Sequence, residues 1–125
     1  MRLAVLMASL LAVSPSAAST REEWIAWMRG AVPAFFCHPN HMYRRCAGVS
    51  EAECRRNATA ALEQCLAKRG SDIPSQITTY ADDLKMQEVI GGCAGKGYMD
   101  RDLVRPRLAH SPECAMAQRK LAGGP

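Results

Sequence analysis

The clearest pattern in the chain is a helical repeat of apolar residues between positions 50 and 70. Ser50 and Glu53 have the form of a capping box, and Lys68-Arg69-Gly70 is typical of a helix end. The pattern therefore predicts a long amphipathic helix between these signals. Its apolar residues recur at steps of three and four: Cys54, Ala58, Ala61, Leu62, Cys65 and Leu66.

A first helix is predicted to begin after Thr20, which forms a second capping box with Glu23. Gly30 weakens its last turn, and Pro33 predicts a bend of the chain around residues 30–33. Phe35 and Phe36 are then expected to enter the core. Its apolar positions, which include two tryptophans interpreted as core residues, are Trp24, Ile25, Trp27, Met28, Ala31 and Val32.

A third helix is predicted to begin after Thr79 and to end at Gly91-Gly92. The glycine-rich stretch 91–97 lacks the spacing of a phosphate-binding loop, so we interpret it as a crowded helix end. Its glycines would permit left-handed torsions and close approach of the backbone. The apolar residues expected on this helix are Tyr80, Leu84, Met86, Val89, Ile90 and Cys93.

The last helix is predicted from Ser111-Pro112-Glu113, which supplies a cap, a proline at the first helical position and an early acid. The segment from Tyr98 to His110 is expected to be irregular, and the tail 122–125 frayed. Hydrophobic residues make up 48% of the chain and aromatics only 6%, which favours a helical core. The sequence thus predicts an all-α, disulfide-cross-linked bundle of about four helices.

The N-terminus has the form of a secretory signal: Arg2, an apolar run from Leu3 to Val13, and small residues before a cut after Ala18. The run is too short to span a bilayer, so no transmembrane segment is expected in the mature chain. The predicted organisation is a signal peptide at 1–18 and one domain at 19–125. We expect the protein to be periplasmic or secreted.

Six cysteines in an exported chain of this length predict three intramolecular disulfides and no free thiol. Cys54 and Cys65 are 11 positions apart on one helix, about 16 Å along its axis, so they cannot pair with each other. Antiparallel helices favour Cys37–Cys46, Cys54–Cys93 and Cys65–Cys114. The nearest competing arrangement has Cys37–Cys54 with Cys46–Cys93.

A metal site is suggested by His38, His41 and Met42 beside Cys37. Oxidation of Cys37 would remove its thiolate as a ligand, so a loop with exposed histidines is the favoured interpretation and no cofactor is expected. The local basic concentration is a weaker candidate for binding an anionic partner, with a solvated charged face as its alternative. It consists of Arg44, Arg45, Arg55 and Arg56.

The spacing of these residues resembles a family of small exported six-cysteine proteobacterial proteins. The resemblance covers roughly the central half of the chain and implies the cross-linked scaffold, but it implies no activity. It rests on Phe36-Cys37, Tyr43, Arg45-Cys46, Val49-Ser50, Glu53-Cys54, Cys65, Ile90-Gly91-Gly92-Cys93-Ala94-Gly95 and Tyr98.

No catalytic signature accompanies His38, His41 and His110, so an enzyme is not expected. Without Arg2 the chain keeps 15 basic residues against 12 acidic ones, too small an excess to indicate nucleic-acid binding. We therefore expect a protein partner. The predicted function is an exported binding protein, in one form an inhibitor or immunity-type protein that blocks a toxin or hydrolase through a rigid helical surface. The alternative is an envelope carrier of a metal or small ligand that uses His38, His41 and Met42.

Overall fold

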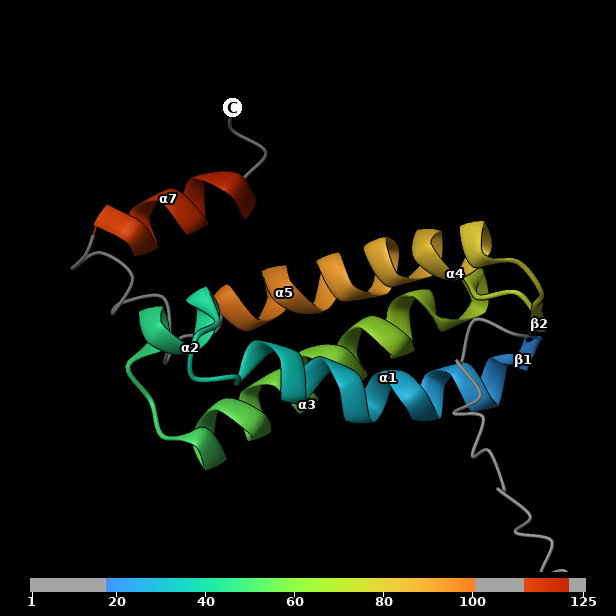
Figure 1. Cartoon of the computed structure of the whole chain (residues 1–125), viewed down its shortest axis with the longest axis horizontal. Helices are drawn as coiled ribbons and strands as arrows, with labels where there is room; N and C mark the ends of the chain where they lie inside the picture. Colours follow the sequence, from blue (N-terminus) through green and yellow to red (C-terminus); the bar gives the residue numbers. More distant parts are fainter. Residues whose placement is uncertain (1–17, 101–111, 122–125) are drawn as a thin grey trace, which may run out of the picture.

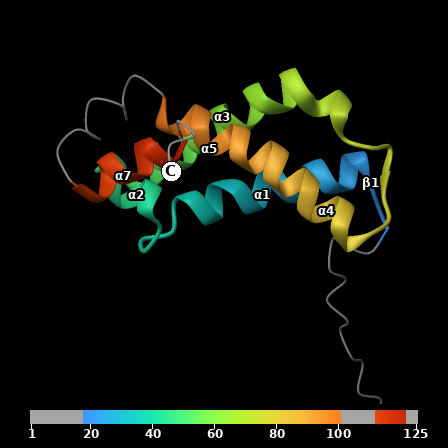
Figure 2. The same cartoon turned by 90° about the horizontal axis from the view of Figure 1, so that it is seen from above.

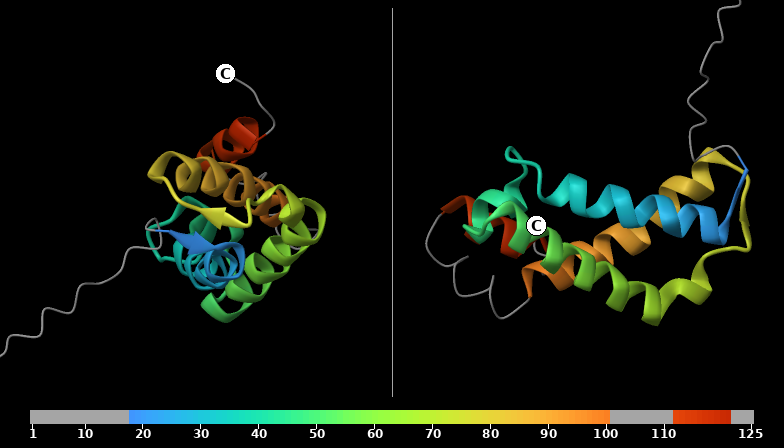
Figure 3. Two further views of the ribbon diagram at one scale, coloured as in Figure 1. Left: turned by 90° about the vertical axis from the view of Figure 1, so that its right-hand side faces the viewer. Right: turned by 90° about the horizontal axis from the view of Figure 1, so that it is seen from below.

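The structure, a computed structural model, describes residues 18–100 and 112–121. Three long helical segments lie side by side: α1 (Arg21–Phe36), α3 (Glu51–Arg69), and the run formed by α4 (Tyr80–Met86), η2 (Gln87–Gly91) and α5 (Gly92–Met99). Figure 1 shows α3 and the α4–α5 run pointing in opposite directions, and the end-on view of Figure 3 shows the three segments around a common core. The prediction of an all-α, cross-linked fold is confirmed.

Short elements close the two ends of the bundle. The helices α2 (Met42–Ala47) and α7 (Pro112–Leu121) lie together at one end, as Figure 2 shows from above. At the other end a 3₁₀ turn, η1 (Gly70–Asp72), follows α3, and β1 (Ser19–Thr20) pairs antiparallel with β2 (Gln76–Ile77). The sequence had not predicted this ribbon, because two-residue strands carry no periodic signal.

The three helix starts predicted from capping residues are confirmed. Backbone amides of Glu23, Glu53 and Asp82 donate to the side chains of Thr20, Ser50 and Thr79 at 3.2, 3.2 and 3.1 Å. The first helix, however, continues through Pro33 to Phe36, so its last turn lies later than predicted. Phe36 is buried as expected, whereas the expectation for Phe35 is wrong: its side chain is 63% exposed. Adjacent residues on a helix point in different directions, and only one of the two faces the core.

The predicted helix end at Gly91-Gly92 is also wrong. A π-helical turn, η2, contains Gly91, and α5 continues from Gly92 to Met99. An added Cβ on Gly95 would lie 3.0 Å from Oη of Tyr43, and one on Gly97 would lie 3.5 Å from Cβ of Ala61. Gly95 and Gly97 therefore allow close packing within a helix, so the predicted close approach of the backbone is confirmed. The left-handed torsion falls elsewhere, at Gly48, the C-cap of α2 with φ of +61°.

The buried face of this segment differs from the one predicted. Tyr80 and Leu84 are 67% and 42% exposed, so their assignment to the apolar face is wrong. Tyr98 and Met99 are helical and buried instead of belonging to an irregular segment. Residues 101–110 of that segment, the Ser111 cap, the tail 122–125 and residues 1–17 of the predicted signal lie outside the described residues. The buried stripe consists of Asp83, Met86, Ile90, Ala94 and Tyr98.

All six cysteines are oxidised in three disulfides, as predicted, but all three favoured pairs are wrong. The observed pairs are Cys37–Cys54, Cys46–Cys114 and Cys65–Cys93. The competing arrangement was right for Cys37–Cys54 and wrong for Cys46–Cys93. The prediction assumed that the third helix stops at Cys93, which would place this residue level with Cys54. Because the helix continues, Cys93 lies opposite Cys65, and Tyr98 reaches Cys54, where its hydroxyl donates to Sγ at 3.3 Å.

Candidate binding groove

The candidate site is an apolar groove of about 480 Å³ between α1 and the junction of η2 with α5. Trp27, Ala31 and Phe35 form the wall contributed by α1. The opposite wall is contributed by Gly91 and Gly92, where an added Cβ would meet nothing within 4 Å. Two adjacent glycines therefore leave the groove open where side chains would narrow it. The remaining lining residues are Met28, Val32, Phe36, Tyr43 and Gln87.

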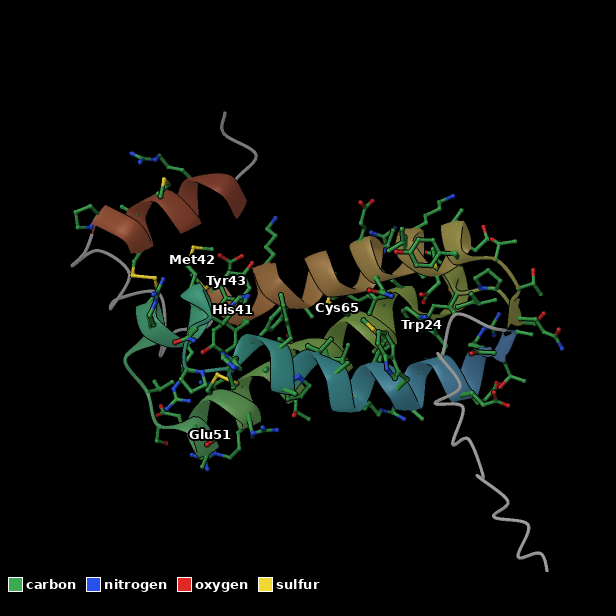
Figure 4. The ribbon with its side chains drawn as sticks, viewed as in Figure 1. Trp24, His41, Met42, Tyr43, Glu51 and Cys65 are labelled. Carbon is green, nitrogen blue, oxygen red and sulfur yellow. A yellow bond between two sulfur atoms is a disulfide. The ribbon has the colours of Figure 1, made fainter. Side chains whose placement is uncertain are left out.

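Phe35 is an exposed aromatic ring in the α1 wall of this groove. It packs edge-on against the imidazole of His41, with ring centroids 4.6 Å apart. Behind it, Phe36 packs against Tyr43 at 4.9 Å, and Tyr43 stacks on Tyr98 at 5.9 Å. Figure 4 shows His41 and Tyr43 close together at the α2 end of the bundle, far from Trp24. The exposed ring is thus supported by a packed aromatic cluster.

Both walls of the groove are covalently fixed to the same helix. Cys37, directly after α1, is bonded to Cys54 of α3, and Cys93 of α5 is bonded to Cys65 of α3. Hydrogen bonds add to these cross-links, because the Trp24 indole of α1 donates to the Asp83 carboxylate of α4 at 2.8 Å. The groove is therefore formed before any partner arrives.

The titratable groups of the aromatic cluster are held in their neutral forms. Burial lowers the pKa of His41, and the charges of His38 and Arg45 lower it further. Burial raises the pKa of Tyr43, and it raises the pKa of Tyr98 to about 12. At neutral pH the cluster presents rings without charge, which suits an apolar ligand better than an ionic one.

The residues proposed for a metal are only partly brought together. His38 and His41 line one small hollow of about 340 Å³ with Phe35, whereas Met42 is not among its lining residues. Nδ1 of His38 accepts from the amide of Asn40, and Nδ1 of His41 accepts from the amide of Tyr43, each at 3.1 Å. Cys37 is in a disulfide. Within the described ranges, no group of three or more His, Cys, Asp or Glu residues is placed to hold a metal ion.

The four arginines proposed for partner binding have different roles in the fold. Arg44 is half-buried and donates to the carbonyls of Val49 and Cys37 at 3.2 and 3.0 Å, so it holds the turns around α2. Arg55 pairs with Glu51 at 3.2 Å along the surface of α3. Arg45 and Arg56 are exposed on different helices. Binding of a partner by these residues stays a prediction.

A second groove, of about 570 Å³, lies between α3 and the α4–α5 run. Its charged lining residues are Lys68, Arg69, Glu88, Lys96 and Asp100, and the Cys65–Cys93 disulfide also lines it.

Sequence reasoning did not find either groove, because each is formed by residues of two helices. One usable signal was present for the first. Phe35 and Phe36 are adjacent on a helix, so their side chains point in different directions and only one ring can face the core. The other ring is then exposed on the surface.

Fold and groove together define a small, helical, disulfide-cross-linked protein with an apolar surface groove. None of the helices in the described ranges is long and apolar enough to cross a membrane. A family model described as the type II secretion system substrate NttA matches residues 18–106, and the chain belongs to this family. It is therefore a secreted protein, which confirms the predicted export. Periplasmic residence and proteobacterial origin stay predictions. Comparisons with curated proteins and with solved structures found no match.

Proposed function

We propose that this secreted protein is an inhibitor-type binding protein that blocks a toxin or hydrolase. In this proposal the α1–α5 groove receives an apolar segment of the partner, and Phe35 anchors the contact. The observation that carries the proposal is the apolar groove itself, with a 63% exposed phenylalanine in its lining and both walls cross-linked to α3.

Preorganisation supports this proposal energetically. Association must offset the loss of translational and side-chain freedom, and a rigid groove lowers that cost because its walls do not need to be ordered on binding. Aromatic side chains, phenylalanine among them, are enriched in the cores of protein–protein interfaces. Because Phe35 is 63% exposed, burial of the exposed part of its side chain would contribute about 1–2 kcal/mol.

The proposal is tested against a panel of secreted hydrolases, with one purified enzyme for each hydrolase class. The protein is titrated against a protease, a muramidase, a phospholipase and a nuclease, and residual activity is measured. We expect stoichiometric inhibition within one class. Phe35→Ala should weaken that inhibition by at least about tenfold, because it removes the anchor ring without touching the core.

Two further variants make the result specific to the groove. Gly91→Trp fills the groove from its open wall and should abolish inhibition, and Gly91 is not among the lining residues of the second groove. Tyr80→Ala removes an equally exposed aromatic ring outside the groove and should leave inhibition unchanged. Inhibition that is insensitive to both Phe35→Ala and Gly91→Trp would contradict the proposed binding surface, and the absence of inhibition across the panel would contradict the inhibitor role.

Carriage of a metal or small ligand is the second candidate. The observation that favours it is the shared hollow of His38 and His41. Because each Nδ1 accepts a backbone hydrogen bond, the proton of each neutral ring is on Nε2, so a metal would bind only after the ring changed tautomer and released that hydrogen bond. Titration of the oxidised protein with Zn²⁺ and Cu²⁺ tests it calorimetrically. Stoichiometric binding lost in His38→Ala would support carriage, and binding that is unchanged in this variant would contradict it.

A further inference from the structure

The three disulfides differ in their access to solvent. Cys37 and Cys54 are 2% and 0% exposed, and Cys54 is covered by the hydroxyl of Tyr98. Cys46 and Cys114 are 5% and 6% exposed. Cys93 is partly exposed and lines the second groove together with Cys65, which is itself 3% exposed. This bond borders the second groove, whose volume of about 570 Å³ is large enough for a tripeptide-sized thiol.

The charges around the Cys65–Cys93 bond follow the helical repeat. Lys68 and Arg69 lie three and four residues after Cys65, and Lys96 lies three residues after Cys93, so each cation shares a face with its cysteine. Glu88 and Asp100 also line the groove, and Arg69 pairs with Asp72 at 3.2 Å. Among the described residues, neither Lys68 nor Lys96 has an ion-pair partner.

These observations point to a reaction at this disulfide. We propose that Cys65–Cys93 is a thiol-exchange site that is opened by anionic low-molecular-weight thiols of the glutathione class. Free lysine ammonium groups at the groove attract the carboxylates of such a thiol and raise its local concentration. The same cations favour the thiolate form of the leaving cysteine.

The exchange proceeds in two balanced steps. The incoming thiol loses its proton to solvent, and its thiolate attacks Sγ of the more exposed Cys93; a mixed disulfide forms while Cys65 leaves as a thiolate with the bonding electron pair. A second thiolate then attacks the sulfur of the bound thiol, which releases Cys93 as a thiolate and gives the oxidised, disulfide form of the reductant. Two reductant thiols thus supply the two electrons.

Opening this bond has a defined structural consequence. The two cysteines are 28 positions apart in the sequence, and the segment between them includes η1, β2, α4 and η2. After reduction, this segment remains attached through non-covalent contacts such as the Trp24–Asp83 hydrogen bond and the β1–β2 pairing. Its amides should therefore exchange faster while α1 and α3 remain protected.

The test uses the mature, fully oxidised protein at pH 7.5 with graded ratios of reduced to oxidised glutathione. Samples are quenched with N-ethylmaleimide and analysed by non-reducing peptide mapping. We expect Cys65–Cys93 to open at least tenfold faster than the other two bonds, with a transient glutathione adduct on Cys93. Earlier opening of Cys46–Cys114, opening of all three bonds at one rate, or adducts confined to Cys65 would overturn the proposal.

A charge variant tests the role of the lysines separately. Lys68→Gln with Lys96→Gln should slow opening by glutathione about three- to tenfold and leave opening by neutral 2-mercaptoethanol unchanged. Lys85→Gln, an exposed cation on α4 outside the groove, should change neither rate. Equal slowing with both thiols would contradict the attraction of anionic thiols, and circular dichroism beforehand establishes that each variant is folded.

Discussion

The indole nitrogen of Trp24 donates a hydrogen bond to Oδ1 of Asp83 at 2.8 Å, although neither side chain is more than 2% exposed. The other carboxylate oxygen accepts from Nε2 of Gln87 at 2.9 Å. This buried carboxylate joins α1 to the start of α4. It satisfies the indole N–H of the largest side chain that is fully buried in the core.

Removal of this acceptor should destabilise the protein. Asp83→Ala leaves the indole N–H buried without a partner, and we expect a loss of about 2 kcal/mol in the free energy of unfolding. Asp83→Asn keeps an oxygen for Trp24 and should cost less. Urea denaturation followed by tryptophan fluorescence measures both.

Two controls separate this hydrogen bond from a general charge effect. Asp82→Ala removes the neighbouring exposed acid and should change stability by less than about 0.5 kcal/mol. Trp24→Phe combined with Asp83→Ala should cost less than the sum of the single changes, because the bond can be lost only once. Additive costs would show that the two residues act independently.

Acidification should weaken the start of α2. His41 caps this helix by accepting a hydrogen bond from Tyr43 at Nδ1, which only the unprotonated nitrogen can do. The pKa of His41 is lowered in the folded state, so the unfolded chain binds the proton more readily. The stabilisation by the neutral His41 cap is therefore fully present above the pKa of His41 in the unfolded chain, about 6.5. It is lost as the pH falls from that value through the lower pKa of the folded state.

Melting temperatures between pH 8 and pH 5 measure this effect. His41→Asn retains a capping side chain that does not titrate. The melting temperature of the wild-type protein should fall further on acidification than that of His41→Asn. Parallel curves for the two proteins would rule out His41 as the group responsible.

Two glycine substitutions should have opposite effects on stability. Gly95→Ala brings Cβ to 3.0 Å from Oη of Tyr43 and should destabilise the aromatic cluster by about 1 kcal/mol or more. Gly30→Ala lies in an exposed helical position with nothing within 4 Å of the added carbon, and should stabilise by about 0.5–1 kcal/mol. Chemical denaturation compares them. Tyr43→Phe should recover part of the Gly95→Ala loss, and a Gly95→Ala variant as stable as Gly30→Ala would contradict the packing argument.

Loss of the Cys46–Cys114 cross-link should release α7 and spare the rest of the bundle. This bond joins α2 to α7 across 68 positions of sequence. In Cys46→Ala with Cys114→Ala we expect far-ultraviolet circular dichroism to lose the signal of about one ten-residue helix. The near-ultraviolet signal of buried Trp24 should persist, and trypsin should cleave near Arg119.

The matched variant removes Cys37 and Cys54, which join α1 to α3 within the core. It should lower the global melting temperature. If the Cys46 and Cys114 variant instead loses the near-ultraviolet signal, α7 is part of the cooperative core and the expectation fails.

The sequence alone determined what depends on a few neighbouring residues. Thr20, Ser50 and Thr79 cap helices because each side chain meets an amide only three residues ahead, and that geometry is independent of the rest of the fold. The oxidation of all six cysteines likewise needed only their number and the predicted export.

The tertiary structure decided how the helices pair. Glycine at positions 91, 92, 95 and 97 indicates a helix end when only local propensity is considered, yet packing against Tyr43 and Ala61 offsets that weakness and the helix continues. Because the helix continues, Cys93 lies beside Cys65 and not beside Cys54 as predicted. The disulfide pairing therefore could not be predicted from the spacing of the cysteines in the sequence. Both grooves have the same origin: their walls come from different helices, and only the packing of those helices brings Phe35 near Gly91, and the Cys65–Cys93 bond near Lys68 and Lys96.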